Sequence, residues 1–167
     1  MKELTEVLSA RHRKKEFSCG KQMLDNYLHK QANQDIKRKL SVCFVLPDKE
    51  NNLIKGYYTL ASNSISQELV PPRYRKKFPR SYTSIPTTLL GRLAVDGRYQ
   101  KQGIGKLLLI DALRRSYEIS KSIGSFAVVV DPLDKDAEKF YEQYGFIKLP
   151  DSGKMFLPMG IIKALFE

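Results

Sequence analysis

The stretch that decides the fold lies in the middle of the chain and reads LLGRLAVDGRYQKQGIGK (residues 89–106). Its apolar first part predicts a strand, and a helical pattern begins after a turn that contains Gly103 and Gly105. Glycine has no Cβ, so the backbone can approach a ligand closely, and free N–H groups at a helix start bind phosphate. The turn matches neither a dinucleotide fingerprint nor a P-loop. The stretch therefore predicts a strand, a turn suited to a pyrophosphate and a helix, in that order.

Hydrophobic periodicity on both sides of this stretch predicts alternating strands and helices. Strands are expected at residues 2–8, 42–46, 53–65, 87–95, 125–131, 146–149 and 155–157, and helices at residues 21–39, 103–121 and 134–144. Basic or proline-rich sequence predicts loops at residues 11–17 and 67–86. The order strand, helix, strand, helix, strand in the second half is typical of an α/β or α+β sheet domain.

Length and composition fit one compact domain over residues 1–167. Hydrophobic residues make up 42% of the chain, which excludes a disordered protein. The longest unbroken apolar run, residues 126–130, is far shorter than the ~18–20 residues that span a bilayer, so we expect no membrane contact. The first residues, MKELTE, include acidic side chains and lack the apolar region of a secretory signal, so we expect a cytoplasmic protein.

The cysteines and histidines are too few and too scattered for several kinds of site. Cys19 and Cys43 lack the paired spacing of a zinc site, so no metal is expected. His12 and His29 both lie in the first 30 residues, apart from any nucleophile pattern, and we expect both at the surface.

Positive charge is concentrated in the first part of the chain. The formal net charge is +11, and residues 1–90 carry 17 Lys+Arg against 8 Asp+Glu. Most of the excess lies in three clusters: Arg11, Arg13, Lys14 and Lys15; Lys37, Arg38 and Lys39; and Arg73, Arg75, Lys76, Lys77 and Arg80. If folding gathers the clusters on one face, they would attract a polyanion such as nucleic acid. The alternative is an ordinary solvated surface.

Two motifs resemble the GCN5-related N-acetyltransferase (GNAT) family. QKQGIG (residues 100–105) matches the Q/R-x-x-G-x-G/A element of that family, and AEKFYEQYGF (residues 137–146) matches its A-x-x-F-Y-x-x-x-G-F pattern. The resemblance implies a mixed, mostly antiparallel sheet flanked by helices, with a V-shaped splay after the strand ending near Val95. It also implies acetyl-CoA as the cosubstrate.

Four further segments resemble one branch, the toxin acetyltransferases of bacterial toxin-antitoxin pairs. They are FSCG (17–20), LDNYL (24–28), GYYTLA (56–61) and LGRLAVD (90–96). Together the matches run over nearly the whole chain. They imply acetylation of the α-amino group on aminoacyl-tRNA, a ribbon-helix-helix antitoxin as partner, and a homodimer. Pro132 after Asp131 departs from the family, where a small residue is usual, and puts the local cofactor contact in doubt.

The resemblance also assigns candidate site residues. Tyr141 would protonate the departing thiolate, although helical spacing alone favours a core aromatic there. The backbone N–H near Val95 would hold the oxyanion. The residues expected at acetyl-CoA are Leu93, Ala94, Val95, Gln100, Lys101, Gln102, Gly103, Ile104, Gly105, Lys106, Asp131 and Tyr141. Those expected at the acceptor substrate are Arg73, Arg75, Lys76, Lys77 and Arg92, the last with the alternative of pairing with an acidic neighbour. No general base is assigned.

Two other functions remain open from the sequence. One is an N-acetyltransferase for a small amine or a protein amino group, with the basic residues serving only solubility. The other is a catalytically silent module that binds acetyl-CoA or an antitoxin.

Overall fold

The computed structural model describes residues 3–167, and its strands form a seven-stranded sheet in the order β1-β2-β3-β4-β5-β7-β6. The strands are β1 (Glu6–Val7), β2 (Val42–Pro47), β3 (Ile54–Ser66), β4 (Ser84–Val95), β5 (Ala127–Val130), β6 (Ile147–Lys148) and β7 (Met155–Pro158). The α-helices are α1 (Gln22–Asn26), α2 (Ala32–Lys37), α3 (Pro72–Arg75), α4 (Ile104–Ser120), α5 (Lys135–Gln143) and α6 (Met159–Phe166). Short helical turns are η1 (Lys14–Glu16), η2 (Tyr27–Gln31, a π-helix), η3 (Gln67–Leu69) and η4 (Gly97–Tyr99). The expected mixed sheet with flanking helices is confirmed.

The chain divides into two compact units, and both β3 and β4 contribute to each. The first unit comprises residues 3–61 and 91–112, and the second comprises residues 62–90 and 113–167.

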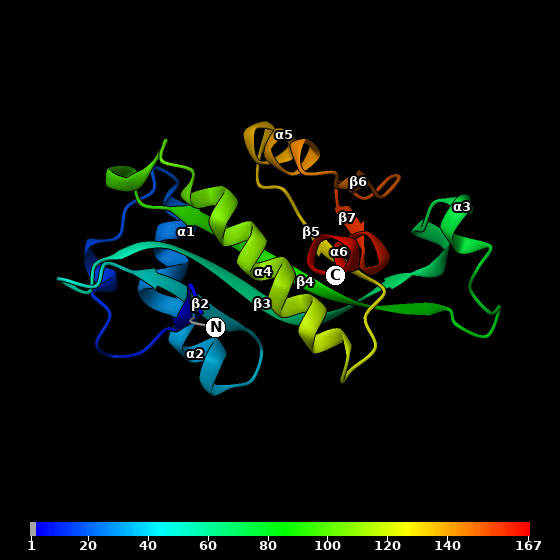
Figure 1. The fold of residues 1–167 in the computed structure, drawn as a ribbon, viewed down its shortest axis with the longest axis horizontal. Helices are drawn as coiled ribbons and strands as arrows, with labels where there is room; N and C mark the ends of the chain where they lie inside the picture. Colours follow the sequence, from blue (N-terminus) through cyan, green and yellow to red (C-terminus); the bar gives the residue numbers. More distant parts are fainter. Residues whose placement is uncertain (1–2) are drawn as a thin grey trace. The chain divides into compact units, whose positions relative to one another are not determined.

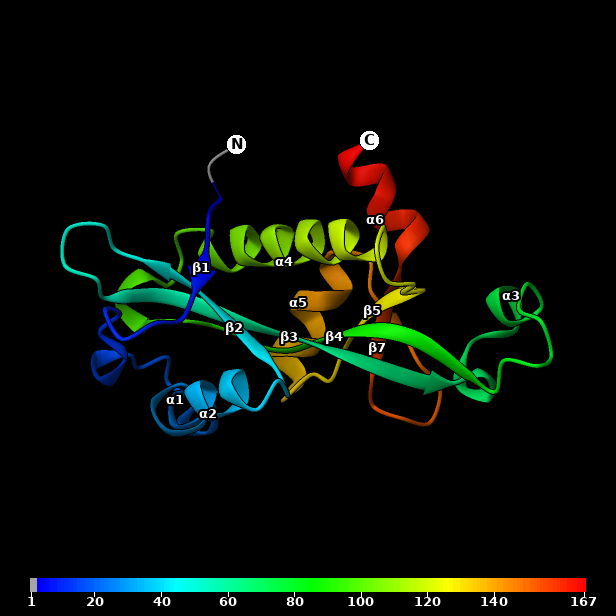
Figure 2. The ribbon, with the colours of Figure 1, turned by 90° about the horizontal axis from the view of Figure 1, so that it is seen from below.

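In the first unit, helices cover both faces of the strands. Figure 2 shows the first half of α4 on one face of β2 and β3, and α1 and α2 on the other. The alternation of side chains along β3 produces this arrangement. Tyr58 donates a hydrogen bond to Asp111 of α4 (2.6 Å), and Gly56 lies against Leu108 of the same helix. Tyr57 points the other way and donates to the Leu24 carbonyl of α1 (2.7 Å).

The second unit is built on β5. This strand pairs in parallel with β4 over Thr88–Leu90 and antiparallel with β7, which in turn pairs with β6. Its core contains side chains from β3, β4, β5 and β7: Ile65, Ile85, Ala127, Val129 and Phe156.

The connection between β3 and β4 is more ordered than the sequence analysis predicts. The expected loop over residues 67–86 contains η3, α3 and the start of β4 (Figure 1). Proline occupies the first helical position of α3, where its missing N–H costs nothing. Tyr74 and Phe78 pack edge-on against Phe126, with ring centroids 6.2 and 4.8 Å away. These aromatic contacts hold a segment that local sequence alone marks as irregular.

Four further differences concern element boundaries. The expected strand at residues 2–8 is the two-residue β1, with Lys2 outside the described residues. Residues 14–16 of the expected basic loop form η1. The helix expected over residues 21–39 is interrupted by the π-helix η2 and ends at Lys37. Helix α6 has no counterpart among the expected elements; it is a short helix whose one charged side chain is Lys163.

Among residues 3–167 no helix combines the length and apolar character needed to cross a bilayer.

Candidate active site

The end of β4 has a backbone edge that β5 does not cover. The parallel pairing with β5 stops at Leu90 and Val130, where β5 ends, whereas β4 continues to Val95. Residues 91–95 therefore have peptide N–H and C=O groups that no residue of β5 pairs. The predicted contact residues Leu93, Ala94 and Val95 all lie on this extension. An extended ligand with amide groups, such as a pantetheine chain, can add to such an edge as a strand does.

The turn after β4 leads into α4 through two residues in the left-handed backbone region. Lys101 has φ +64° and Gly103 has φ +78°. Helix α4 begins at Ile104, and the Gly103 carbonyl accepts the first helical hydrogen bond from Leu107 (3.2 Å). A Cβ at Gly103 would have no atom within 4 Å, so space does not require glycine here. Glycine is favoured because it adopts a positive φ without steric cost. The first turn of a 17-residue helix thus presents free N–H groups beside this turn.

Of the predicted loop residues, Ile104 is buried and Gly105 is half-buried, whereas Lys101, Gln102 and Lys106 are exposed. The two lysine side chains form no ion pair with any described residue. They are therefore available to an anionic group at the start of α4.

The side chain of Gln100 is bonded to two backbone carbonyls. Its amide donates to the Val95 carbonyl (2.9 Å) and to the Cys19 carbonyl (3.0 Å). This anchoring role could not be predicted from the sequence, because nothing local to the motif indicates the contact with Cys19. Asp96, likewise not predicted, is buried and accepts hydrogen bonds from the backbone N–H of Ser18 (3.0 Å) and from Arg98 (2.8 Å).

Tyr141 lies on α5 in the second unit and is 6% exposed. Its ring contacts the rings of Phe140 and Phe146, with centroids 5.3 and 5.2 Å away. No described residue hydrogen-bonds its hydroxyl, and the only fully covered side-chain oxygen or nitrogen without a partner in residues 3–167 is Thr59 Oγ1. The Tyr141 hydroxyl therefore keeps access to solvent. Burial raises the pKa of Tyr141 above its ordinary value, so the phenol is protonated at neutral pH.

Arg92 is half-buried on β4, and its guanidinium carbon lies 3.5 Å from the ring centroid of Tyr27. Tyr27 in turn donates a hydrogen bond to Asp35 (2.8 Å). Burial raises the pKa of Tyr27 to about 12, although the charge of Arg92 opposes the shift. The alternative of an acidic partner for Arg92 is wrong within the described residues, because the cation lies on an aromatic face. No residue among 3–167 accepts a hydrogen bond from the Arg92 guanidinium, so its N–H donors are available to a ligand. Asp131 is exposed directly after β5.

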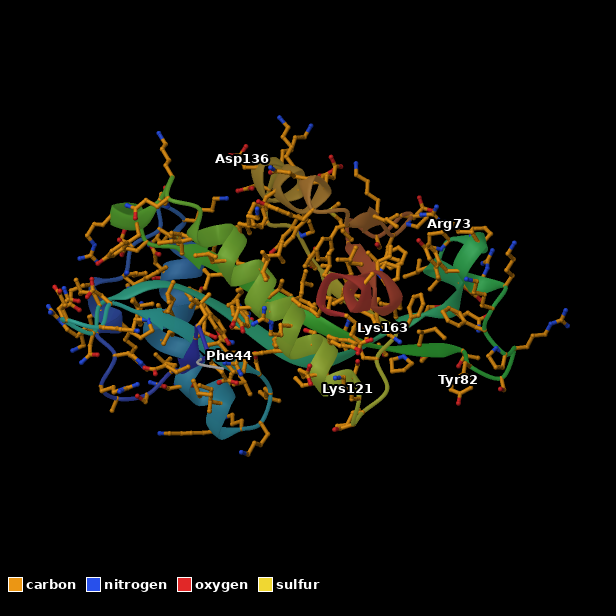
Figure 3. The ribbon with its side chains drawn as sticks, viewed as in Figure 1. Phe44, Arg73, Tyr82, Lys121, Asp136 and Lys163 are labelled. Atoms are coloured by element: carbon orange, nitrogen blue, oxygen red, sulfur yellow. The ribbon has the colours of Figure 1, made fainter. Side chains whose placement is uncertain are left out.

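The basic residues 73–77 lie on α3 and the turn after it, in the second unit. Figure 3 shows Arg73 and Tyr82 on this connection between β3 and β4. The Arg73 guanidinium lies over the Tyr74 ring (4.7 Å), and Arg75 donates to the Glu68 carbonyl (3.3 Å). Lys76 and Lys77 are exposed. The other two basic clusters belong to the first unit.

The histidine and cysteine side chains have structural partners. His12 is buried, contrary to the surface position expected, because its ring lies between the Ser9 N–H (2.9 Å) and the Glu6 carboxylate (2.7 Å). His29 is half-buried and contacts the Phe17 carbonyl (2.9 Å). Burial raises the pKa of Cys19 to about 11, which makes it a poor nucleophile. Within residues 3–167 no cluster of three metal-ligating side chains exists.

Two known toxins are similar to this chain in sequence. The chain is 38% identical over 130 residues to a tRNA-acetylating toxin of Mycobacterium tuberculosis, covering 78% of this chain and 75% of the relative. It is 34% identical over 163 residues to the probable toxin TacT of Sinorhizobium fredii, covering 93% and 90%.

Two solved structures have the same fold over almost the whole chain. The toxin AtaT complexed with acetyl-methionyl-tRNAfMet superposes with a TM-score of 0.90 at 29% identity, covering 98% of each chain. A mutant of AtaT bound to acetyl-CoA and to the C-terminus of the antitoxin AtaR superposes with a TM-score of 0.82 at 28% identity, covering 97% and 96%.

The match to the acetyltransferase (GNAT) domain extends over residues 44–148 and includes both motifs of the predicted site. The expectation of an acetyl-CoA-dependent N-acetyltransferase is thereby confirmed. This chain belongs to the GNAT acetyltransferase family.

Proposed function

We propose that this enzyme is a toxin that transfers the acetyl group of acetyl-CoA to the α-amino group of the amino acid on charged tRNA. The observation that carries the proposal is its likeness, over most of its length, to a tRNA-acetylating toxin and to a toxin solved with acetylated aminoacyl-tRNA. The free guanidinium of Arg92 and the exposed lysines after α3 add chemistry suited to an RNA backbone.

The acetyl donor is assigned to the first unit. We place its pantetheine amides on Leu93, Ala94 and Val95, and its pyrophosphate on the peptide groups of residues 100–106. Lys101 and Lys106 would neutralise the phosphate charge. Asp131 is assigned to the cofactor site on the family resemblance alone.

In the proposed reaction the neutral amine attacks the thioester carbonyl, forming the C–N bond and a tetrahedral oxyanion. The backbone N–H of Val95 donates to that oxyanion, a contribution of roughly 3–4 kcal/mol in comparable sites. The C–S bond then breaks, and Tyr141 gives its proton to the thiolate. The amine loses its extra proton to water, so no side chain is assigned as general base.

Contacts with the acceptor are assigned to Arg92 in the first unit and, separately, to Arg73, Arg75, Lys76 and Lys77 in the second. These side chains would contact phosphates rather than bases, so they fix the position of the tRNA without selecting its sequence.

Four further assignments complete the proposal. Residues 1–167 act as one catalytic domain, which the family match across both units supports. The protein works in the cytoplasm as a homodimer. A ribbon-helix-helix antitoxin neutralises it, and the AtaT complex with its antitoxin supports a partner of this role.

The test is transfer of labelled acetyl from acetyl-CoA to a pool of aminoacylated tRNA. Deacylated tRNA and a panel of small amines and peptides serve as competing acceptors, and Tyr141→Phe is the matched variant. We expect label on charged tRNA alone and its loss in Tyr141→Phe. Label on an amine or peptide with none on tRNA would instead identify a general N-acetyltransferase. Activity that Tyr141→Phe leaves unchanged would remove the assigned general acid, and no transfer at all would favour a silent binding module.

A further inference from the structure

The turn assigned to acetyl-CoA is held by residues 16–19, which precede α1. We call these residues the strap. Arg98 donates to the Glu16 carbonyl (3.1 Å), and the Asp96 carboxylate accepts from the Ser18 N–H (3.0 Å). The backbone of Gly97 donates to the Ser18 carbonyl (2.8 Å). Each of these contacts joins the chain after β4 to backbone more than seventy residues away.

The helical side of the first unit binds the same strap. The Cys19 N–H donates to Asp25 of α1 (2.8 Å), and His29 of η2 contacts the Phe17 carbonyl (2.9 Å). The Phe17 side chain is buried and its ring lies edge-on to Tyr57 (5.4 Å). The strap has little regular structure of its own, yet its peptide groups are bonded on both sides. It is therefore a fixed support for the turn after β4.

The side chain of Gln100 joins the strap to the end of β4. One amide group donates to the carbonyl of Val95, the last residue of β4, and to the carbonyl of Cys19 in the strap. Gln100 itself is exposed, so apolar packing does not account for its place. We infer that Gln100 is a positioning residue for acetyl-CoA, because its amide locks the end of β4 and the cofactor turn onto the strap.

The turn needs such a lock, because its backbone is unfavourable by itself. Lys101, the next residue, has φ +64°, a region that residues with a Cβ rarely adopt, and Gly103 has φ +78°. Both precede the first turn of α4, whose N–H groups must converge on the pyrophosphate. Without the two hydrogen bonds of Gln100, the turn would be ordered only when the ligand binds. The free-energy cost of ordering the turn would then weaken the binding of acetyl-CoA.

The inference rests on the proposed placement of the pyrophosphate at residues 100–106. The experiment is titration calorimetry with acetyl-CoA alone, so it does not depend on the acceptor. Gln100→Met removes both donors at similar size, Gln100→Glu replaces them with an acceptor, and Gln100→Arg restores several donors. Gln34→Met is the matched control, because Gln34 is exposed on α2 and its side chain bonds no described residue. Gly103→Val tests the turn itself.

We expect Gln100→Met to raise the Kd about tenfold, which corresponds to about 1.4 kcal/mol, and Gln100→Glu to raise it further. Gln100→Arg should recover most of the affinity, and Gln34→Met should match the wild type. Stoichiometry should stay unchanged and Tm should fall by no more than about 6 °C in all Gln100 variants, which separates a positioning role from loss of folded protein. If Gln100→Met and Gln100→Glu keep the wild-type Kd while Gly103→Val loses binding, the role of Gln100 is overturned and the placement of acetyl-CoA stands. Wild-type binding by Gly103→Val would overturn the placement of acetyl-CoA as well.

Discussion

Three properties of Tyr141 bear on its assignment as general acid for the thiolate. Its side chain is buried beside Phe140 and Phe146, its hydroxyl is bonded to no described residue, and its pKa is raised by burial. A general acid must be protonated to act, and a raised pKa extends the protonated range upward from the ordinary value of 10.0. The hydroxyl therefore holds its proton at every pH at which the enzyme is expected to work.

We predict that kcat shows no alkaline decline from Tyr141 below about pH 10. Tyr141→Phe should lower kcat by about 10²–10⁴-fold over the whole range, with little change in acetyl-CoA affinity. Single-turnover kinetics on amide-linked aminoacyl-tRNA, which resists alkaline hydrolysis, measure this. A decline centred between about pH 8 and 10 that disappears in Tyr141→Phe would contradict the raised pKa of Tyr141, whereas an unchanged kcat in Tyr141→Phe would contradict its assignment as general acid.

Arg92 supplies a second test at the same scale. Its guanidinium is supported by the Tyr27 ring and bonded to no described acid, so one phosphate can take its N–H donors. We predict that Arg92→Met raises KM for aminoacyl-tRNA about tenfold and reduces the slope of log KM against log salt by about one. Acetyl-CoA affinity should not change. Arg92→Lys, which keeps the charge but loses the planar stack, should be intermediate. An unaltered salt slope would show that Arg92 does not contact a phosphate.

At the scale of elements, β3 and α4 approach so closely that a side chain cannot fit at Gly56. A Cβ there would lie 2.7 Å from Leu108 Cδ1 and 2.9 Å from the Ala94 carbonyl oxygen, and the second of these is backbone. We predict that Gly56→Ala lowers the free energy of unfolding by about 1–3 kcal/mol, measured by urea denaturation. Gly160→Ala is the control, because a Cβ at Gly160 meets nothing within 4 Å. Equal stability of the two variants would show that α4 shifts freely on the sheet.

The elements also differ in how well local sequence predicts them. The helix expected at residues 134–144 is α5 (Lys135–Gln143), whose polar and apolar faces are distinct and whose start is capped by Asp134. The segment over residues 67–86 is predicted less well, because Tyr74 and Phe78 are ordered by contacts with Phe126, just before β5, rather than by neighbours in sequence. Neither proline nor glycine marks the π-helix η2, so its sequence reads as ordinary helix.

At the scale of the whole molecule, the net charge of +11 should control how the enzyme meets its acceptor. We predict that kcat/KM for aminoacyl-tRNA falls at least about tenfold between low and physiological salt, whereas the Kd for acetyl-CoA changes much less. Converting Lys76 and Lys77 to Gln should flatten the salt slope by about two. The control converts Lys135 and Lys139 of α5 to Gln, because these lysines lie outside the three clusters and the change in net charge is the same. If the two double variants flatten the salt slope equally, the net charge of the protein attracts the RNA, and Lys76 and Lys77 have no special role.

The sequence by itself predicted the fold class from short-range periodicity, and its two family motifs made residues 100–106 and Tyr141 the candidates for the cofactor turn and the general acid. Gly103 lies in the expected turn with a positive φ, and α4 begins beside it at Ile104. Only the tertiary structure decided what Gln100, Arg92 and His12 do. Gln100 bonds a carbonyl 81 residues away, Arg92 lies on Tyr27 of a different element, and His12 is buried against Glu6. Such contacts depend on how distant segments pack. The periodicity of one segment predicts which of its side chains are buried, but not which distant residue each side chain contacts.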